Sequence, residues 1–90
     1  MPGELNHYHS DLTDIRSTGI CHVIEIDKDT VIIVKKDELN GISMKGQQVT
    51  LYFKNFPAIS TRLPYNNKKM LDKLTAFVKK ELTKDYLDDI

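Results

Sequence analysis

Residues 20–36 read Ile-Cys-His-Val-Ile-Glu-Ile-Asp-Lys-Asp-Thr-Val-Ile-Ile-Val-Lys-Lys. Two runs rich in Ile and Val flank a polar break, which is the pattern of two β-strands joined by a tight turn. With Lys28 and Asp29 in the turn, Ile26 is expected to face Val31. The stretch therefore predicts an antiparallel hairpin around which the rest of the chain is organised.

This register predicts a hairpin that is apolar on both faces. One face, expected to be the core, carries Ile24, Ile26, Val31 and Ile33. The opposite face carries Val23, Ile32 and Val34 beside Glu25. Strands that are apolar on both sides are typical of the middle of a fold. The second face therefore needs a cover, which is either the N-terminal segment or another protein chain.

The size and composition indicate one small globular domain. The chain has 90 residues, 40% of them hydrophobic, with 13 Lys and Arg balancing 13 Asp and Glu. A zero net charge provides no overall field toward nucleic acid or an anionic membrane. No apolar run is long enough for a membrane span, the N-terminus lacks the pattern of a signal peptide, and the single cysteine forms no internal disulfide. We therefore expect a cytoplasmic protein.

A second hairpin and a further strand are predicted after residue 41. Gly46 and Gln47 fit a two-residue turn that pairs Met44 with Val49 and Ile42 with Leu51. Beyond the break at Asn55-Phe56-Pro57, a three-residue loop is expected to set Phe53 opposite Ile59. These connections agree with one inward face, so residues 19–63 are predicted to form an antiparallel meander.

The two ends of the chain are predicted to differ. Residues 66–84 show apolar side chains at helical spacing, with Asn66 as N-cap and a staple between Tyr65 and Met70. The apolar stripe of this helix is Met70, Leu71, Leu74, Phe77, Val78 and Leu82. Residues 85–90 form an acidic tail that could act as a short acidic and hydrophobic ligand. The polar N-terminal segment 1–18 is expected to hold a short helical turn capped by Ser10.

The predicted fold class is α+β, a single domain over residues 1–90. It combines an antiparallel meander of about five strands, as a sheet or a partly closed barrel, with one C-terminal amphipathic helix packed on one face. Over Val49 to Leu82 this order of sheet and helix resembles small bacterial pleckstrin-homology-like domains. The chain is short for that family and carries no diagnostic motif of it, so the resemblance implies a fold and no function.

Catalytic and metal sites are not expected. His7, His9 and Asp11 alternate, and Cys21 and His22 could join them as zinc ligands, but there is no Cys-x-x-Cys and no second cysteine. Cys21 and His22 are neighbours on a strand, so their side chains point to opposite faces and cannot act as a nucleophile and its base. Carboxylates gather where turns are expected. We therefore predict no enzyme activity, no cofactor and no metal.

Two binding functions remain. The leading hypothesis is a small non-enzymatic protein–protein interaction module, a regulator or inhibitor of a larger protein, which binds a partner or itself as a homo-oligomer. Its predicted binding residues are Val23, Ile32, Val34, Tyr52 and Arg62. The alternative is a nucleic-acid-binding domain that uses basic residues on the outer sheet face and on the helix. Lys54 and Arg62 are expected near Tyr52 on that face, and aromatic side chains among cations bind single strands.

Overall fold

The computed structural model describes residues 5–82, with side chains from residue 10 onward. It contains six strands, a short 3₁₀ turn and one helix. These are β1 (Leu5–Thr18), β2 (Cys21–Ile26), β3 (Thr30–Lys35), η1 (Lys36–Glu38), β4 (Leu39–Lys45), β5 (Gln48–Phe53), β6 (Ile59–Arg62) and α1 (Lys68–Glu81). The predicted α+β class, a sheet followed by one C-terminal helix, is confirmed.

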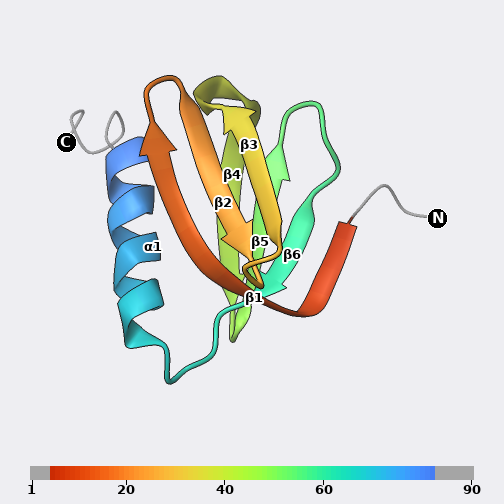
Figure 1. Ribbon diagram of the computed structural model, residues 1–90, viewed down its shortest axis with the longest axis vertical. Helices are drawn as coiled ribbons and strands as arrows, with labels where there is room; N and C mark the ends of the chain where they lie inside the picture. The colour runs from red at the N-terminus through yellow and green to blue at the C-terminus, as the bar shows by residue number, and fades with distance from the viewer. Residues whose placement is uncertain (1–4, 83–90) are drawn as a thin grey trace.

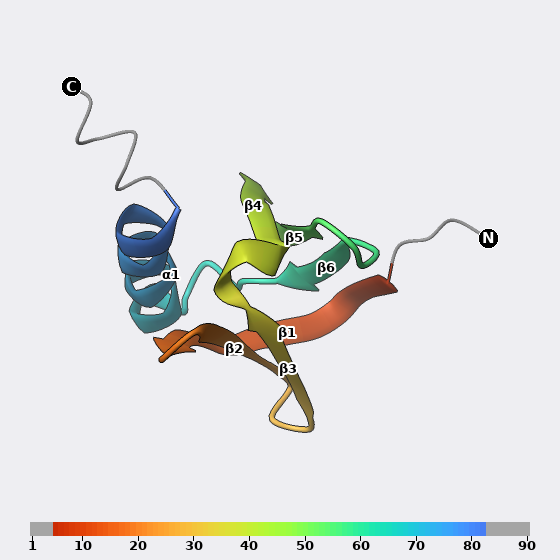
Figure 2. The same ribbon diagram turned by 90° about the horizontal axis from the view of Figure 1, so that it is seen from above.

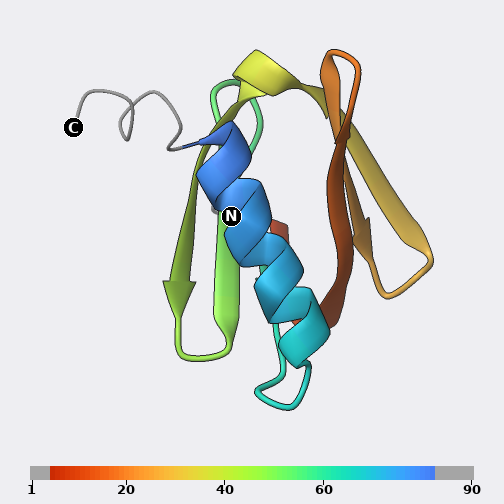
Figure 3. The same ribbon diagram turned by 90° about the vertical axis from the view of Figure 1, so that its left-hand side faces the viewer.

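The strands form one open sheet in the order β3-β2-β1-β6-β5-β4. All neighbouring pairs are antiparallel except β1 and β6, which run parallel. The sheet is curled into two leaves, β1-β2-β3 and β4-β5-β6, which the bent strand β1 joins (Figures 1 and 2). The turn η1 links the two edge strands, and α1 lies across the opening between the leaves (Figure 3).

Residues 5–18 of the N-terminal segment form β1, one of the two central strands of this sheet, so the predicted helical turn is wrong. The first part of β1 pairs with β6, and from Leu12 onward it pairs with β2. A β-bulge at Thr13 breaks the alternation, so Leu12 and Ile15 both face the core although they are three residues apart. The Thr13 hydroxyl donates to the Glu25 carbonyl, and the Thr61 hydroxyl donates to the Ser10 carbonyl, which satisfies backbone groups at the bend.

The β2–β3 hairpin exists, but its register differs by one residue from the prediction. Ile26 pairs with Thr30 and Ile24 pairs with Ile32, so three residues, Asp27 to Asp29, form the turn. Asp27 and Lys28 adopt positive φ angles of 56° and 66°. Because successive strand residues alternate between faces, this slip reverses every side chain of β3.

The second hairpin agrees with its prediction. Met44 pairs with Val49 and Ile42 with Leu51, and Gly46 adopts the positive φ of 61° that the turn requires. Leu51, and not Phe53, lies opposite Ile59, so the loop to β6 is longer than expected. The shift is two residues, which leaves the inward face unchanged.

The helix begins one residue later than predicted. The side chain of Asn67, and not that of Asn66, accepts a hydrogen bond from the Met70 amide at 3.1 Å. The expected staple is therefore absent, and Tyr65 is exposed. Met70, Leu74 and Phe77 are buried as predicted, whereas Leu71 is exposed. Helix α1 ends at Glu81, and the predicted acidic tail, residues 85–90, lies outside the described residues.

One hydrophobic core fills the space between the leaves and the helix. Its buried members are Leu12, Ile15, Ile24, Ile26, Val34, Leu39, Val49, Leu51, Phe53, Ile59, Leu63, Met70, Leu74 and Phe77. Ile32 packs against this cluster. Ile33, which the predicted register placed in the core, is 63% exposed.

Candidate protein-binding surface

The three apolar residues of the predicted binding patch do not share one face of the sheet. Val34 faces the core and is buried, and Ile32 packs against the core from the same side of β3. Only Val23 points to the outer face, where its strand neighbours Arg16 and Ile33 flank it and leave it 7% exposed. The reversed register of β3 is the reason for this correction.

The same reversal exposes a different set of apolar side chains. Val31 and Ile33 on β3 are 55% and 63% exposed, and Phe56 in the β5–β6 loop is 57% exposed. Between the strand and the loop lies an apolar groove of about 330 Å³, here named the β3 groove. Its lining residues are Thr30, Ile32, Ile33, Val34, Phe53, Phe56, Pro57 and Ile59.

The far wall of the β3 groove is held in place by Glu38 of η1. The Glu38 carboxylate accepts hydrogen bonds from the Asn55 amide and, at 2.9 Å, from the Asn55 side chain. The Glu38 carbonyl also accepts from the Lys54 amide. Phe56 then packs edge-on against Phe53, with ring centroids 6.4 Å apart. The groove is therefore built by specific contacts on its loop side as well as by the strand.

The other wall of the groove is a free strand edge. Among residues 5–82, β3 pairs with β2 alone. The Lys36 amide donates to the Ile20 carbonyl in the register of the hairpin, so the even-numbered residues of β3 direct their backbone groups at β2. Val31, Ile33 and Lys35 consequently direct their backbone N–H and C=O groups away from the sheet. Unpaired groups of this kind are a template for an added strand.

Tyr52 and Arg62, the other predicted binding residues, lie on the second leaf and do not join the β3 groove. Tyr52 of β5 is 43% exposed, and its hydroxyl is 3.2 Å from that of Ser43. The Arg62 guanidinium donates to Asp11 at 2.8 Å, and this contact raises the pKa of the arginine. The charge of Arg62 is therefore matched within the protein.

Cys21 and His22 point to opposite faces, as predicted. Cys21 is half-buried on the outer face, whereas His22 is buried, with its Nδ1 2.8 Å from the Ser17 hydroxyl. Burial lowers the pKa of His22, and nearby Lys36 acts in the same direction while Glu81 opposes it. The neutral ring is thus a core side chain facing the helix.

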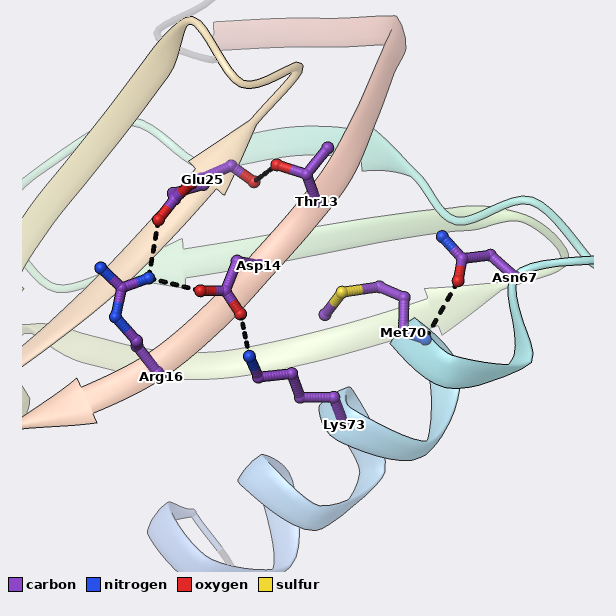
Figure 4. A network of polar contacts seen from close by, with 7 residues as sticks. All are labelled: Thr13, Asp14, Arg16, Glu25, Asn67, Met70 and Lys73. Atoms are coloured by element: carbon purple, nitrogen blue, oxygen red, sulfur yellow. Dashed lines mark hydrogen bonds and ion pairs between the residues drawn. The ribbon is translucent and has the colours of Figure 1, made fainter.

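The largest charged cluster joins α1 to the first leaf (Figure 4). Asp14 of β1 accepts from Lys73 of the helix and from Arg16, and Arg16 also donates to Glu25 at 2.7 Å. Burial alone would raise the pKa of Asp14, but the hydrogen bonds from Lys73 and Arg16 outweigh it and lower the pKa. Each charge in this cluster has a partner, so the cluster ties structural elements together.

Two carboxylates of the β2–β3 turn accept hydrogen bonds. Asp27 accepts the Asp11 amide at 2.8 Å, and Asp29 accepts the Thr30 hydroxyl. His7 and His9 lie in β1, but their side chains are outside the described ones. Among the side chains that are described, no three His, Cys, Asp or Glu residues gather as metal ligands would.

The residues of the β3 groove were missed at the sequence level except for Ile32 and Val34. Phe56 lies in the predicted break Asn55-Phe56-Pro57, where no periodic pattern indicates which way an aromatic side chain points.

Within residues 5–82 no helix has the length and apolar character needed to cross a membrane. No protein-family model, curated protein or solved structure matches the chain.

Proposed function

We propose that this chain is a small non-enzymatic protein-binding module that acts in the cytoplasm, and that its binding element is the free edge of β3 with the β3 groove beside it. An extended segment of a partner protein adds to the sheet as a strand next to β3. Such strand addition obtains affinity from backbone hydrogen bonds and specificity from pockets for alternate side chains. The regulation of a larger protein fits this mode of binding.

The observation that carries the proposal is the coincidence of two features at one strand. The outward backbone groups of Val31, Ile33 and Lys35 offer hydrogen bonds, and the groove offers apolar contact to every second side chain of an added strand. Natural sheets protect free edges with charge, bulges or proline. The middle of β3 has none of these, because its central residues are Val31, Ile32, Ile33 and Val34.

Nucleic-acid binding has weaker support in the geometry. Arg62 is paired with Asp11, and Lys73 is paired with Asp14, so two of the cations available to a phosphate backbone are already matched. The aromatic residue of the predicted nucleic-acid site is Tyr52 on β5, and its hydroxyl lies beside that of Ser43 on β4. This class is therefore an outcome of the test, and it is not the function we propose.

The test is selection of ligands from a displayed library of random peptides. Peptides that bind the protein are expected to be extended, with apolar residues at alternate positions. Ile33→Lys places a charge at the centre of the exposed edge and should abolish their binding. Met44→Lys is the matched control, because Met44 is a 47% exposed apolar residue on the opposite edge strand, β4.

The outcomes separate the two classes of function. Peptide binding that is lost in Ile33→Lys and kept in Met44→Lys supports the proposal. Peptides that bind both variants equally well contradict it. Retention of the protein on heparin at moderate salt, with no peptide selected, would replace it by nucleic-acid binding.

A further inference from the structure

We infer that the natural occupant of the β3 edge includes a second copy of this chain, and that two copies pair β3 with β3 in antiparallel orientation about a two-fold axis at Ile32. The inference rests on the proposed role of β3 as a binding edge. Its support is the charge and backbone pattern of the strand, which is complementary to itself when Ile32 lies on the axis.

The backbone limits the registers that are open to such a pair. Odd-numbered residues of β3 direct their N–H and C=O groups outward, so hydrogen-bonded pairs across the axis join odd residues to odd residues. Pairing Val31 with Ile33 of the second copy meets this condition and sets Ile32 opposite itself. Two-fold symmetry repeats each contact, as isologous dimers require.

This register also matches the charges at the two ends of the strand. Asp29 lies beside Lys35 of the second copy, and the symmetry gives the contact twice. Among the described residues, neither Asp29 nor Lys35 has an ion-pair partner within its own chain. Lys28 then lies opposite Lys36 of the second copy, a like-charge contact that Glu81, 3.7 Å from Lys36, partly offsets.

The register with Ile33 on the axis is less favourable. In it, Val31 meets Lys35 of the second copy and Asp29 meets Asp37. The first contact places an apolar side chain against a charge, and the second places like charges together, which destabilises a strand pair. With Val31 on the axis, Asp27 meets Lys35 of the second copy, but Ile33 then meets the charge of Asp29. Self-pairing at Ile32 avoids each contact between an apolar side chain and a charge on this face.

The β3 groove accommodates the same arrangement. Ile32 and Val34 line the groove from the inner face of β3. In the inferred register, Ile32 lies opposite Ile32 of the second copy, and Val34 lies opposite Thr30 of the second copy. All of these side chains project from the same face. The side chain of Ile32 from the second copy therefore enters the groove toward Phe56, while Val31 and Ile33 of both copies form one apolar strip on the outer face. In Figure 2 the two edge strands splay apart from η1, which leaves β3 at the margin of the sheet.

Exchange of charges tests the pairing directly. Sedimentation velocity over a concentration series should show a dimer for the parent protein. Asp29→Lys and Lys35→Asp each create two like-charge pairs, so either variant alone should dimerise roughly tenfold more weakly. An equimolar mixture of the two variants restores an attractive pair at both positions, so the mixture should recover dimer. The double variant should also dimerise as the parent does.

Disulfide formation tests the register. In a Cys21→Ser background, Ile32→Cys places two thiols across the axis and should form a cross-linked dimer under mild oxidation. Ile33→Cys is the matched comparison, since in this register it faces Val31 of the second copy and should cross-link far less. Efficient cross-linking through Ile33→Cys and not Ile32→Cys would overturn the register.

Different results contradict self-pairing and the proposed binding at β3. A parent protein that stays monomeric throughout the series contradicts self-pairing, even if selected peptides still require Ile33. A dimer that the charge variants leave unchanged, and that Met44→Lys disrupts, contradicts both.

Discussion

The ring of His22 on β2 meets the ring of Phe77 on α1 edge-on, with centroids 4.9 Å apart and planes at 69°. This contact joins the helix to the first leaf through a buried member of the apolar stripe of the helix. It therefore provides a test of how the helix is held and a titratable group within the core.

Phe77→Ala should destabilise the protein severely. Phe77 is 6% exposed, and truncating a buried phenylalanine costs about 3–5 kcal/mol. The free energy of unfolding of a small domain is roughly 5–15 kcal/mol, so we expect a large part of the stability to be lost. Chemical denaturation measures the change, with Leu71→Ala on the exposed side of the helix as control. A Phe77→Ala protein as stable as the control would show that the stripe does not pack as described.

The stability should fall as the pH falls through the ordinary pKa range of histidine. Because burial lowers the pKa of His22 in the folded protein, the unfolded chain takes up the proton first. The contribution of His22 to the free energy of unfolding is therefore constant at higher pH. It decreases below about pH 6.5, by at most about 1.4 kcal/mol per pH unit. His22→Gln removes this titration, so denaturation curves between pH 7.5 and 5.5 should differ less for the variant. An equal decrease in both proteins would assign the effect to other groups.

Asp14→Asn should loosen the helix from the first leaf. The substitution removes the ion pairs of Asp14 with Lys73 and Arg16, and because both cations are partly exposed we expect a loss of about 1 kcal/mol. The folded pKa of Asp14 is lowered, so its contribution is present above the ordinary carboxyl pKa and is lost as the pH falls through the folded value. The parent protein should therefore melt at a higher temperature than the variant at pH 7, and the two melting temperatures should converge at low pH. A difference in melting temperature that grows at low pH contradicts this assignment.

Glu38→Gln should weaken binding at the β3 groove without unfolding the protein. The side chain holds the Asn55 amide and, through it, the loop that carries Phe56. Loss of the charged acceptor costs about 1 kcal/mol locally and frees the groove wall. Peptide or self-association should become weaker while the melting temperature changes by a few degrees. Asp37→Asn, in the same turn, is the control.

The helix and the second hairpin were predictable because one local feature of the sequence determines each of them. Gly46 fixed the turn between β4 and β5, and the spacing of Met70, Leu74 and Phe77 fixed the face of α1. The N-terminal strand was not predictable in this way. The bulge at Thr13 places Leu12 and Ile15 on one face at a spacing of three, which is a helical period.

The exposed face of β3 was not predictable for a different reason. Val31 to Val34 are all apolar, so the hydrophobic pattern of β3 is the same in either register. The choice was made by the turn, where Asp27 and Lys28 adopt positive φ and a third residue, Asp29, completes the loop. A slip of one residue then exchanged Ile32 and Val34 with Val31 and Ile33.

The register of β3 determines what a lysine does at each of its positions. Ile32→Lys places a charge against the core and should destabilise the protein, because Ile32 packs on the buried cluster. Ile33→Lys places the charge in solvent and should leave the folded state intact. Comparing the melting temperatures of the two variants checks the register. A stable Ile32→Lys with an unfolded Ile33→Lys would contradict it.

Amide hydrogen exchange at single residues shows whether a strand adds to the free edge of β3. In dilute protein or in Ile33→Lys, the amides of Val31 and Lys35 should exchange fast, while those of Ile32 and Val34 are protected by β2. On association, by concentration or by a selected peptide, exchange at Val31, Ile33 and Lys35 should slow in the parent protein. Strand addition at β3 completes the protection of β3 in this way, and protection that appears instead along β4 would contradict it.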